Sequence, residues 1–130
     1  MSSIFSKIAR GEISSYKVAE NDNFFAFLDI NPLVKGHVLV IPKKEIDYFF
    51  DIADDDLGCM MVFVKKVANA IKKTVSCKRI GLAVVGFDVP HAHIHLVPLQ
   101  DIQDIDFNRK RVNLLPEEFL DIADRISKNM

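Results

Sequence analysis

Residues 91–98, His-Ala-His-Ile-His-Leu-Val-Pro, alternate histidine with apolar side chains. Successive side chains of a β-strand point to opposite faces, so a strand here places His91, His93 and His95 on one face and the intervening apolar residues on the other. The pattern therefore predicts a strand with one face in the core and the other available for chemistry.

The histidine face has three interpretations: a solvated face of an edge strand, a metal site, or a catalytic site. A single ion with bonds of ~2 Å could hold two of the three rings but hardly all, because same-face neighbours on a strand lie ~6.6 Å apart. Imidazole titrates near ~6.5, so one ring can act as a nucleophile while a neighbour carries the proton that a leaving group needs. Attack on phosphorus would give a phosphohistidine-type intermediate that water then opens, and we favour this interpretation.

Length and composition limit the class of protein. The chain has 130 residues, 49% of them apolar, which predicts one domain with a substantial core. The 17 Lys and Arg nearly balance the 18 Asp and Glu, for a net charge of -1, so no broad surface for nucleic acid or membrane is expected. No apolar run approaches the ~20 residues of a membrane span, and the first residues do not resemble a signal peptide. We expect a cytoplasmic protein in which Cys59 and Cys77 are free thiols.

Apolar periodicity and turn residues predict the other elements. The run 54–75 has apolar residues at helical spacing, and it begins with three aspartates that suit a helix N-terminus. Shorter apolar runs between turn residues indicate strands. We predict helices near 3–11, over 54–75 and from Pro116, and strands over 16–20, 24–30, 36–42, 79–85 and 91–96.

The predicted helix 54–75 also has a second, weaker apolar strip. Cys59, Phe63 and Ala70 fall outside its main stripe. Ordinary partial exposure is one interpretation of this strip, and a face that packs on a second copy of the chain is the other.

Four blocks of the sequence together resemble one family. Residues 91–97 match the His-x-His-x-His-apolar-apolar motif of the histidine triad family of nucleotide hydrolases and transferases, and residues 3–13, 26–30 and 31–44 resemble its other blocks in the same order. The resemblance implies an α+β fold, in which an antiparallel sheet of about five strands carries one long helix, with a short N-terminal helix and a C-terminal helix. It also implies a single domain over residues 1–130, with the triad-bearing core at 3–99 and a tail and helix at 100–130, and a homodimer.

The resemblance implies roles for the four histidines. His93 would be the nucleophile that becomes nucleotidylated, and His95 would bond a nonbridging phosphoryl oxygen. His91 would orient His93 or stabilise charge. His37 would support this cluster, although a lone histidine at a strand start is more often a structural residue.

Residues that would bind the nucleotide follow from the same resemblance. Taken by itself, Asp29 is compatible with a turn cap or with a carboxylate that accepts two ribose hydroxyls. The resemblance favours the ribose. The residues that it assigns to the base and its apolar pocket are Ile30, Phe5, Ile8 and Phe27.

Three segments depart from the family pattern or stay open. Many bacterial members have a structural zinc site, built from Cys-x-x-Cys and a further histidine, where this chain has Ser3, Ser6 and Glu45; we therefore expect no metal there. The loop before the triad lacks the usual asparagine and glutamine, which leaves backbone N–H groups as phosphate donors. Its residues are Gly86, Phe87, Asp88 and Val89. Residues 109–111, Arg-Lys-Arg, form either a solvated loop or a phosphate-binding cluster.

The predicted function is hydrolysis at the α-phosphorus of a nucleoside 5'-phosphate derivative. A purine nucleotide phosphoramidate is the preferred substrate, and a nucleotidyl-histidine is the intermediate. The alternatives are a dinucleoside polyphosphate hydrolase and an adenosine nucleotide sensor without turnover. Phosphoryl transfer mainly needs alignment and charge compensation, which imidazoles and N–H groups can supply, so we expect no cofactor and no obligatory metal.

Overall fold

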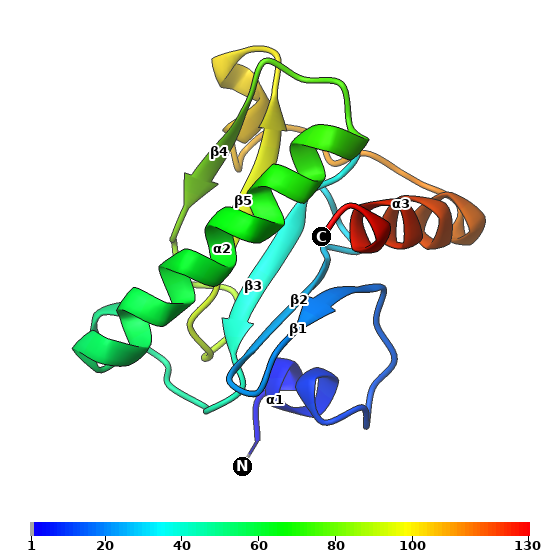
Figure 1. Cartoon of the computed structure of the whole chain (residues 1–130). Helices are drawn as coiled ribbons and strands as arrows, with labels where there is room; N and C mark the ends of the chain where they lie inside the picture. Colours follow the sequence, from blue (N-terminus) through cyan, green and yellow to red (C-terminus); the bar gives the residue numbers. More distant parts are fainter. Residues whose placement is uncertain (1) are drawn as a thin grey trace.

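The structure, a computed structural model, describes residues 2–130 and has an α+β architecture (Figure 1). Its five-stranded antiparallel sheet has the order β1-β2-β3-β5-β4. The strands are β1 (Lys17–Glu20), β2 (Phe24–Leu28), β3 (Val38–Pro42), β4 (Arg79–Ala83) and β5 (Ile94–Leu99). The helices are α1 (Ile4–Ala9), α2 (Asp54–Thr74) and α3 (Pro116–Lys128), with short 3-10 helices η1 (Phe49–Asp51) and η2 (Ile102–Ile105). The predicted fold class is confirmed.

Helices α2 and α3 cover one face of the sheet (Figure 1). Side chains of a strand alternate between faces, so every second residue of β2 and β3 points to this side. The helix-side core contains Phe24, Ala26 and Leu28 of β2 and Val38 and Val40 of β3. None of the helices in residues 2–130 combines the length and apolarity needed to cross a membrane.

The opposite face carries a smaller apolar cluster with α1. Its members are Phe5 and Ile8 of α1, Phe25 and Phe27 of β2, and Leu39 and Ile41 of β3. Because both faces are covered, β2 and β3 are buried along their whole length. The histidines lie on the same side as this cluster, since Leu39 of β3 is paired with His95 of β5.

The apolar face of α2 differs from the predicted stripe. Phe63 and Ala70 are buried in the helix-side core, whereas Met61 is 40% exposed. The second apolar strip therefore does not exist as predicted, because two of its three members pack on the sheet. Cys59 is exposed, and Val62 beside it is 58% exposed.

The triad strand begins later than predicted. Strand β5 starts at Ile94, so His91 and His93 precede it. The N–H of His91 donates to Val89 O at 2.8 Å and the N–H of Ala92 donates to Ile46 O at 2.6 Å, instead of pairing with β3. The predicted alternation of faces still holds in part, because Ala92 and Ile94 both lie in the helix-side core.

Helix α3 packs on the chain's own core. Phe119, Ile122, Ala123 and Ile126 are buried there, and the ring of Phe119 stacks on Tyr16 with centroids 4.9 Å apart. The segment before α3 contacts the loop that precedes β3, where the N–H of Val112 donates to Pro32 O at 2.9 Å. The tail at 100–130 is thus attached both to the helix-side core and to this loop.

Candidate active site

His37 is positioned by a tight turn that directly precedes β3. Gly36 has a φ of +93°, a conformation that glycine adopts without strain. A Cβ at this position would lie 2.9 Å from Cγ2 of Val75. The turn lets the backbone N–H of Leu33 donate to Nδ1 of His37 at 3.0 Å.

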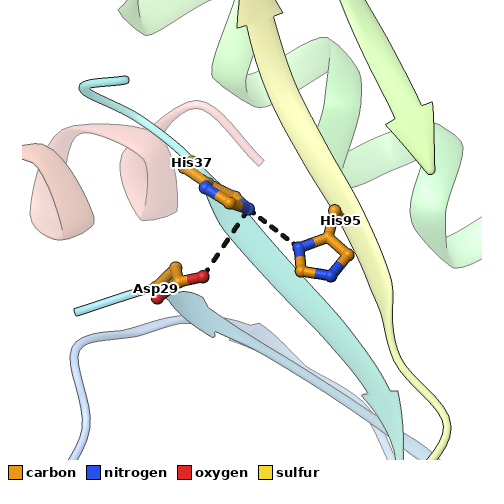
Figure 2. A group of neighbouring side chains, drawn as sticks. All are labelled: Asp29, His37 and His95. Carbon is orange, nitrogen blue, oxygen red and sulfur yellow. Dashed lines mark hydrogen bonds and ion pairs between the residues drawn. The ribbon is translucent and has the colours of Figure 1, made fainter. Parts of the chain in front are cut away.

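This hydrogen bond assigns the protons on two histidines. A backbone N–H can only donate, so Nδ1 of His37 holds a lone pair and Nε2 carries the proton. That Nε2–H donates to Nδ1 of His95 at 3.0 Å (Figure 2). The proton of neutral His95 is therefore on Nε2, which is buried and has no hydrogen-bond partner in residues 2–130. An unpaired buried donor is costly, so this atom is available to an incoming acceptor.

Both of these rings are neutral near neutral pH. Burial lowers the pKa of His37 to about 3 and that of His95 to about 4. The cause is the loss of hydration of the imidazolium form. His37 and His95 thus act as neutral hydrogen-bonding groups and supply no formal positive charge.

His93 has the opposite tautomer to His95. Its Nδ1 lies 2.7 Å from His91 O, a carbonyl that can only accept, so Nδ1 carries a proton and, in the neutral ring, Nε2 holds the lone pair. The ring is held edge-on by Phe5 and by His95, with centroids 5.1 and 5.0 Å away. A lone pair on His93 thus stands beside an N–H on His95.

The ring of His91 faces away from these two. Its Nε2–H donates to Pro42 O at 2.7 Å, and its Nδ1 accepts from the hydroxyl of Ser3 at 2.8 Å. The carbonyl of His91, and not its ring, contacts His93. Burial lowers the pKa of His91 as well.

Ser3 and Ser6 form a hydrogen-bonded cluster with Glu45 and His91. The backbone N–H of Ser3 and the hydroxyl of Ser6 donate to Oε1 of Glu45 at 2.5 and 2.7 Å. These bonds hold the pKa of Glu45 well below its usual range, at about 2. The set does not fit a structural zinc ion, because two hydroxyls stand in place of thiolates and are already engaged with each other and with the carboxylate.

A cavity of about 420 Å³ opens beside His93 and His95. Of the predicted nucleotide-binding residues, it is lined by Phe5, Ile8, Phe27, Asp29, Ile30, Asp88 and Val89. His37 and His91 lie behind this surface and do not line it. The cavity is apolar where Phe5 and Ile8 of α1 face Phe27 of β2.

The structure shows Asp29 in the first of its two predicted roles, the turn cap. Its Oδ1 accepts from the N–H of Asn31 at 2.8 Å, which is the turn cap, and its Oδ2 lies 3.7 Å from Nε2 of His37 (Figure 2). That distance is too long for a hydrogen bond, and neutral His37 makes it no ion pair. Burial raises the pKa of Asp29, so a hydrogen-bond donor from a ligand would stabilise its charged form.

Asp29, His37 and His95 are also the one group in residues 2–130 whose donor atoms could hold a metal ion, all lying within 4.8 Å of one another. Figure 2 shows His37 between the other two. The nitrogens of His37 and His95 that would bind the ion already share a hydrogen bond. No ion is needed to satisfy them.

The loop before the triad is divided between two cavities. Asp88 and Val89 line the cavity beside His95, whereas Gly86 and Phe87 line a second one of about 410 Å³ that shares only His93 with the first. Phe87 is 92% exposed. The structure therefore does not bring Gly86 and Phe87 to the predicted nucleotide cavity.

Two residues of the tail reach the site without having been predicted there individually. Arg111 lines the cavity of His93 and His95, and the ring of Phe107 contacts His95 with centroids 4.7 Å apart. The basic run 109–111 was the only sequence signal for this approach. Sequence spacing cannot show which member of such a run turns inward.

Comparison with known proteins identifies the family of the chain. Residues 10–102 match the HIT domain family. The chain belongs to the histidine triad family. The four sequence blocks had predicted this family.

Relatives and solved structures cover nearly the whole chain. A HIT-like protein of Borreliella burgdorferi is 36% identical over 98% of this chain and 97% of its own length. The adenosine 5'-monophosphoramidase of Schizosaccharomyces pombe is 32% identical, with 100% of this chain and 99% of its own covered. The structure is similar to a crystal structure of a Hit-like protein from Bartonella henselae, with a TM-score of 0.84 and 30% identity over 98% of this chain and 96% of that one.

Proposed function

We propose that this histidine triad protein hydrolyses nucleoside 5'-phosphate derivatives at the α-phosphorus, through a nucleotidyl intermediate on His93. Attack by Nε2 of His93 would form the P–N bond while the bond from phosphorus to the leaving group breaks. Water would then open the intermediate and release the nucleoside monophosphate. The overall reaction consumes one water and returns the leaving group in its protonated form.

The observation that carries this proposal is the pairing of tautomers in one cavity. In the neutral ring of His93, Nε2 has a lone pair, because the Nδ1–H is bound by His91 O. Nε2–H of His95 is a donor without a partner, because its Nδ1 is bound by His37. One ring is prepared to attack phosphorus, and its neighbour is prepared to bond a nonbridging oxygen that gains charge during the attack.

A purine nucleoside phosphoramidate is the substrate that we favour. The apolar part of the cavity, between Phe5, Ile8 and Phe27, suits a flat base. The free Oδ2 of Asp29 is suited to a ribose hydroxyl, since a carboxylate oxygen accepts from O–H groups. Relatives from two further yeasts, Saccharomyces cerevisiae and Candida albicans, are also named adenosine 5'-monophosphoramidases, at 38% and 36% identity.

The test compares the wild-type protein with His93→Gly on an adenosine 5'-phosphoramidate. We expect the wild type to release AMP and to form an adenylyl adduct on His93 that mass spectrometry detects. The variant should lose turnover by several orders of magnitude, and added imidazole should restore part of it by entering the space of the missing ring. Equal turnover in both proteins would refute the role of His93.

The same assay separates the alternative functions. Turnover of a diadenosine polyphosphate without turnover of the phosphoramidate would replace the preferred substrate by a dinucleoside polyphosphate. Binding of AMP with no turnover of either compound would identify a nucleotide sensor. Each result leaves the nucleotide site in place and changes only its reaction.

We also propose a homodimer formed along β4 and α2. Strand β4 is at the edge of the sheet, and Leu82 on it is 47% exposed. The neighbouring helix α2 adds the exposed Met61 and Val62. An unpaired apolar strand edge is a surface that a second copy can cover.

Two further proposals concern the compartment and the domain. Cys59 and Cys77 are free thiols, which agrees with a reducing compartment, and we propose the cytoplasm. We also propose that residues 1–130 fold as one unit, because α3 contributes to the same core as α2. A single cooperative unfolding transition, seen by both fluorescence and circular dichroism, would support that unit.

A further inference from the structure

Two of the four clustered histidines supply no formal charge to the nucleotide cavity. His37 and His95 are neutral near neutral pH, because burial lowers the pKa of each. The charged side chains that line the cavity are Asp29, Asp88 and Arg111. A phosphate group is an anion, so Arg111 is the permanent cation that the cavity offers to it.

Arg111 is held in place by one loop that is distant in sequence and by a ring of its own segment. Its Nη1 donates to Asn31 O at 2.9 Å, and the N–H of the next residue, Val112, donates to Pro32 O at 2.9 Å. The guanidinium carbon lies 5.8 Å from the centroid of the Phe107 ring. These contacts occupy one of the five guanidinium N–H donors and leave the others free.

Phe107 connects Arg111 with the histidines. Its ring contacts His95 edge-on, with centroids 4.7 Å apart. The guanidinium of Arg111, four residues later in the chain, lies over the same ring. The five residues from Phe107 to Arg111 therefore place an aromatic ring on His95 and a cation in the cavity that His95 lines.

The two other basic residues of this run do not have the same place. Arg109 pairs with Asp104, its Nη1 lying 2.9 Å from Oδ1, and Lys110 is exposed to solvent. Neither lines the cavity. The charge of Arg111, in contrast, acts with burial to lower the pKa of His37 and His95, and it opposes the rise that burial causes at Asp29.

We propose that Arg111 is a phosphate-binding residue, whose guanidinium bonds the oxygens of the nucleotide's phosphate together with Nε2–H of His95. The inference rests on the proposed function in that it uses the same cavity and nucleotide. A guanidinium suits this task because its planar fork can bond two phosphate oxygens at once. It supplies a formal positive charge, which the neutral ring of His95 does not.

The test measures binding of AMP and of adenosine by calorimetry, to the wild type and to Arg111→Gln. AMP should bind the variant about 10- to 100-fold more weakly, as expected for losing a charge-assisted bidentate contact. Adenosine has no phosphate, and its affinity should stay the same. Lys110→Gln makes the same change of charge one residue away and should bind both ligands like the wild type. Arg111→Lys, which keeps the charge but loses the fork, should fall between the two.

Several results would overturn the role of Arg111. Equal AMP affinities of Arg111→Gln and Lys110→Gln would do so, as would an equal loss for adenosine and AMP, or a wild type that binds neither ligand. Thermal unfolding of each variant shows whether the fold is kept.

The inference and the proposed function can fail separately. A wild type without turnover whose AMP affinity depends on Arg111 would retain the phosphate site and refute the hydrolase. A wild type that turns over substrate, with AMP affinity that does not depend on Arg111, would retain the hydrolase and refute the phosphate site.

Discussion

His37 donates its Nε2–H to Nδ1 of His95 across 3.0 Å, and this contact determines which nitrogen of His95 carries a proton toward the cavity. Leu33 controls the contact in turn, because its backbone N–H occupies the other nitrogen of His37. A buried histidine outside the cavity thus sets the hydrogen-bonding character of one inside it.

His37 does not line the cavity, so replacing it should affect the reaction through the ring of His95. In His37→Leu, Nδ1 of His95 has no donor, so the proton is free to move to Nδ1 and leave Nε2 as an acceptor. We expect turnover to fall about 10- to 100-fold, in the range for the loss of one positioned donor. We also expect a loss of about 1–3 kcal/mol in the free energy of unfolding, because the Leu33 N–H becomes an unpaired buried donor.

Nitrogen-15 NMR of His95 separates this effect from simple destabilisation. The wild type should show the Nε2–H tautomer, and the variant should show a mixture of tautomers. A variant that keeps the Nε2–H tautomer and full turnover would contradict the assignment.

Stability should depend on pH through the buried histidines. The pKa is about 3 for His37 and about 4 for His95 in the folded protein, against 6.5 when exposed. Below 6.5 the unfolded chain binds more protons than the folded one, so the stabilisation is fully present above that pH. As the pH falls toward about 4, each ring should cost up to about 1.4 kcal/mol per pH unit.

Urea denaturation at several pH values between about 7.5 and 4.5 measures this slope. His95→Gln removes one of the titrating rings and leaves the carboxylates unchanged, so its stability should fall less steeply with decreasing pH. Parallel curves for the two proteins would show that His95 is not titrating as expected.

The serine cluster should stabilise α1 without a metal ion. Ser3 caps α1 by accepting from the N–H of Ser6 and also donates to His91, so Ser3→Ala should lower the free energy of unfolding by about 1–2 kcal/mol. The KM for the nucleotide should rise, because α1 carries Phe5 and Ile8. Ser2→Ala, at the exposed neighbouring position, should change neither quantity.

A chelator tests the metal part of this prediction. Treatment of the wild type with EDTA should leave the melting temperature unchanged, since hydrogen bonds alone satisfy the cluster. A clear drop in melting temperature, reversed by added zinc, would mean that an ion holds these residues.

The proposed dimer should depend on the edge of β4. Leu82→Glu places a charge on an exposed apolar position of this strand, and it should shift the protein from dimer to monomer in size-exclusion chromatography with light scattering. Leu120→Glu, a matched change at a position on α3 that is 61% exposed, should leave the dimer intact. A wild type that is monomeric at micromolar concentration would remove the proposal.

Much of the fold could be read from local patterns. The apolar run 36–42 predicted a strand, and β3 is found at Val38–Pro42, where every residue is buried. The family blocks predicted the α+β class, which is confirmed. The exposed face of α2 was less accessible, because Phe63 and Ala70 could be placed on the core side of α2 only once the helix was docked on the sheet.

The site was predicted in its residue types but not in its connections. Taken alone, the sequence determined that histidines alternate with core residues from 91 to 96, because the period of an extended chain is a local property. Tertiary structure decided that His91 turns toward Ser3, that His37 sets the tautomer of His95, and that Arg111 and not Lys110 enters the cavity. Each of these depends on a hydrogen bond or contact between segments far apart in the chain, and such partners are chosen by how the layers pack rather than by any local pattern.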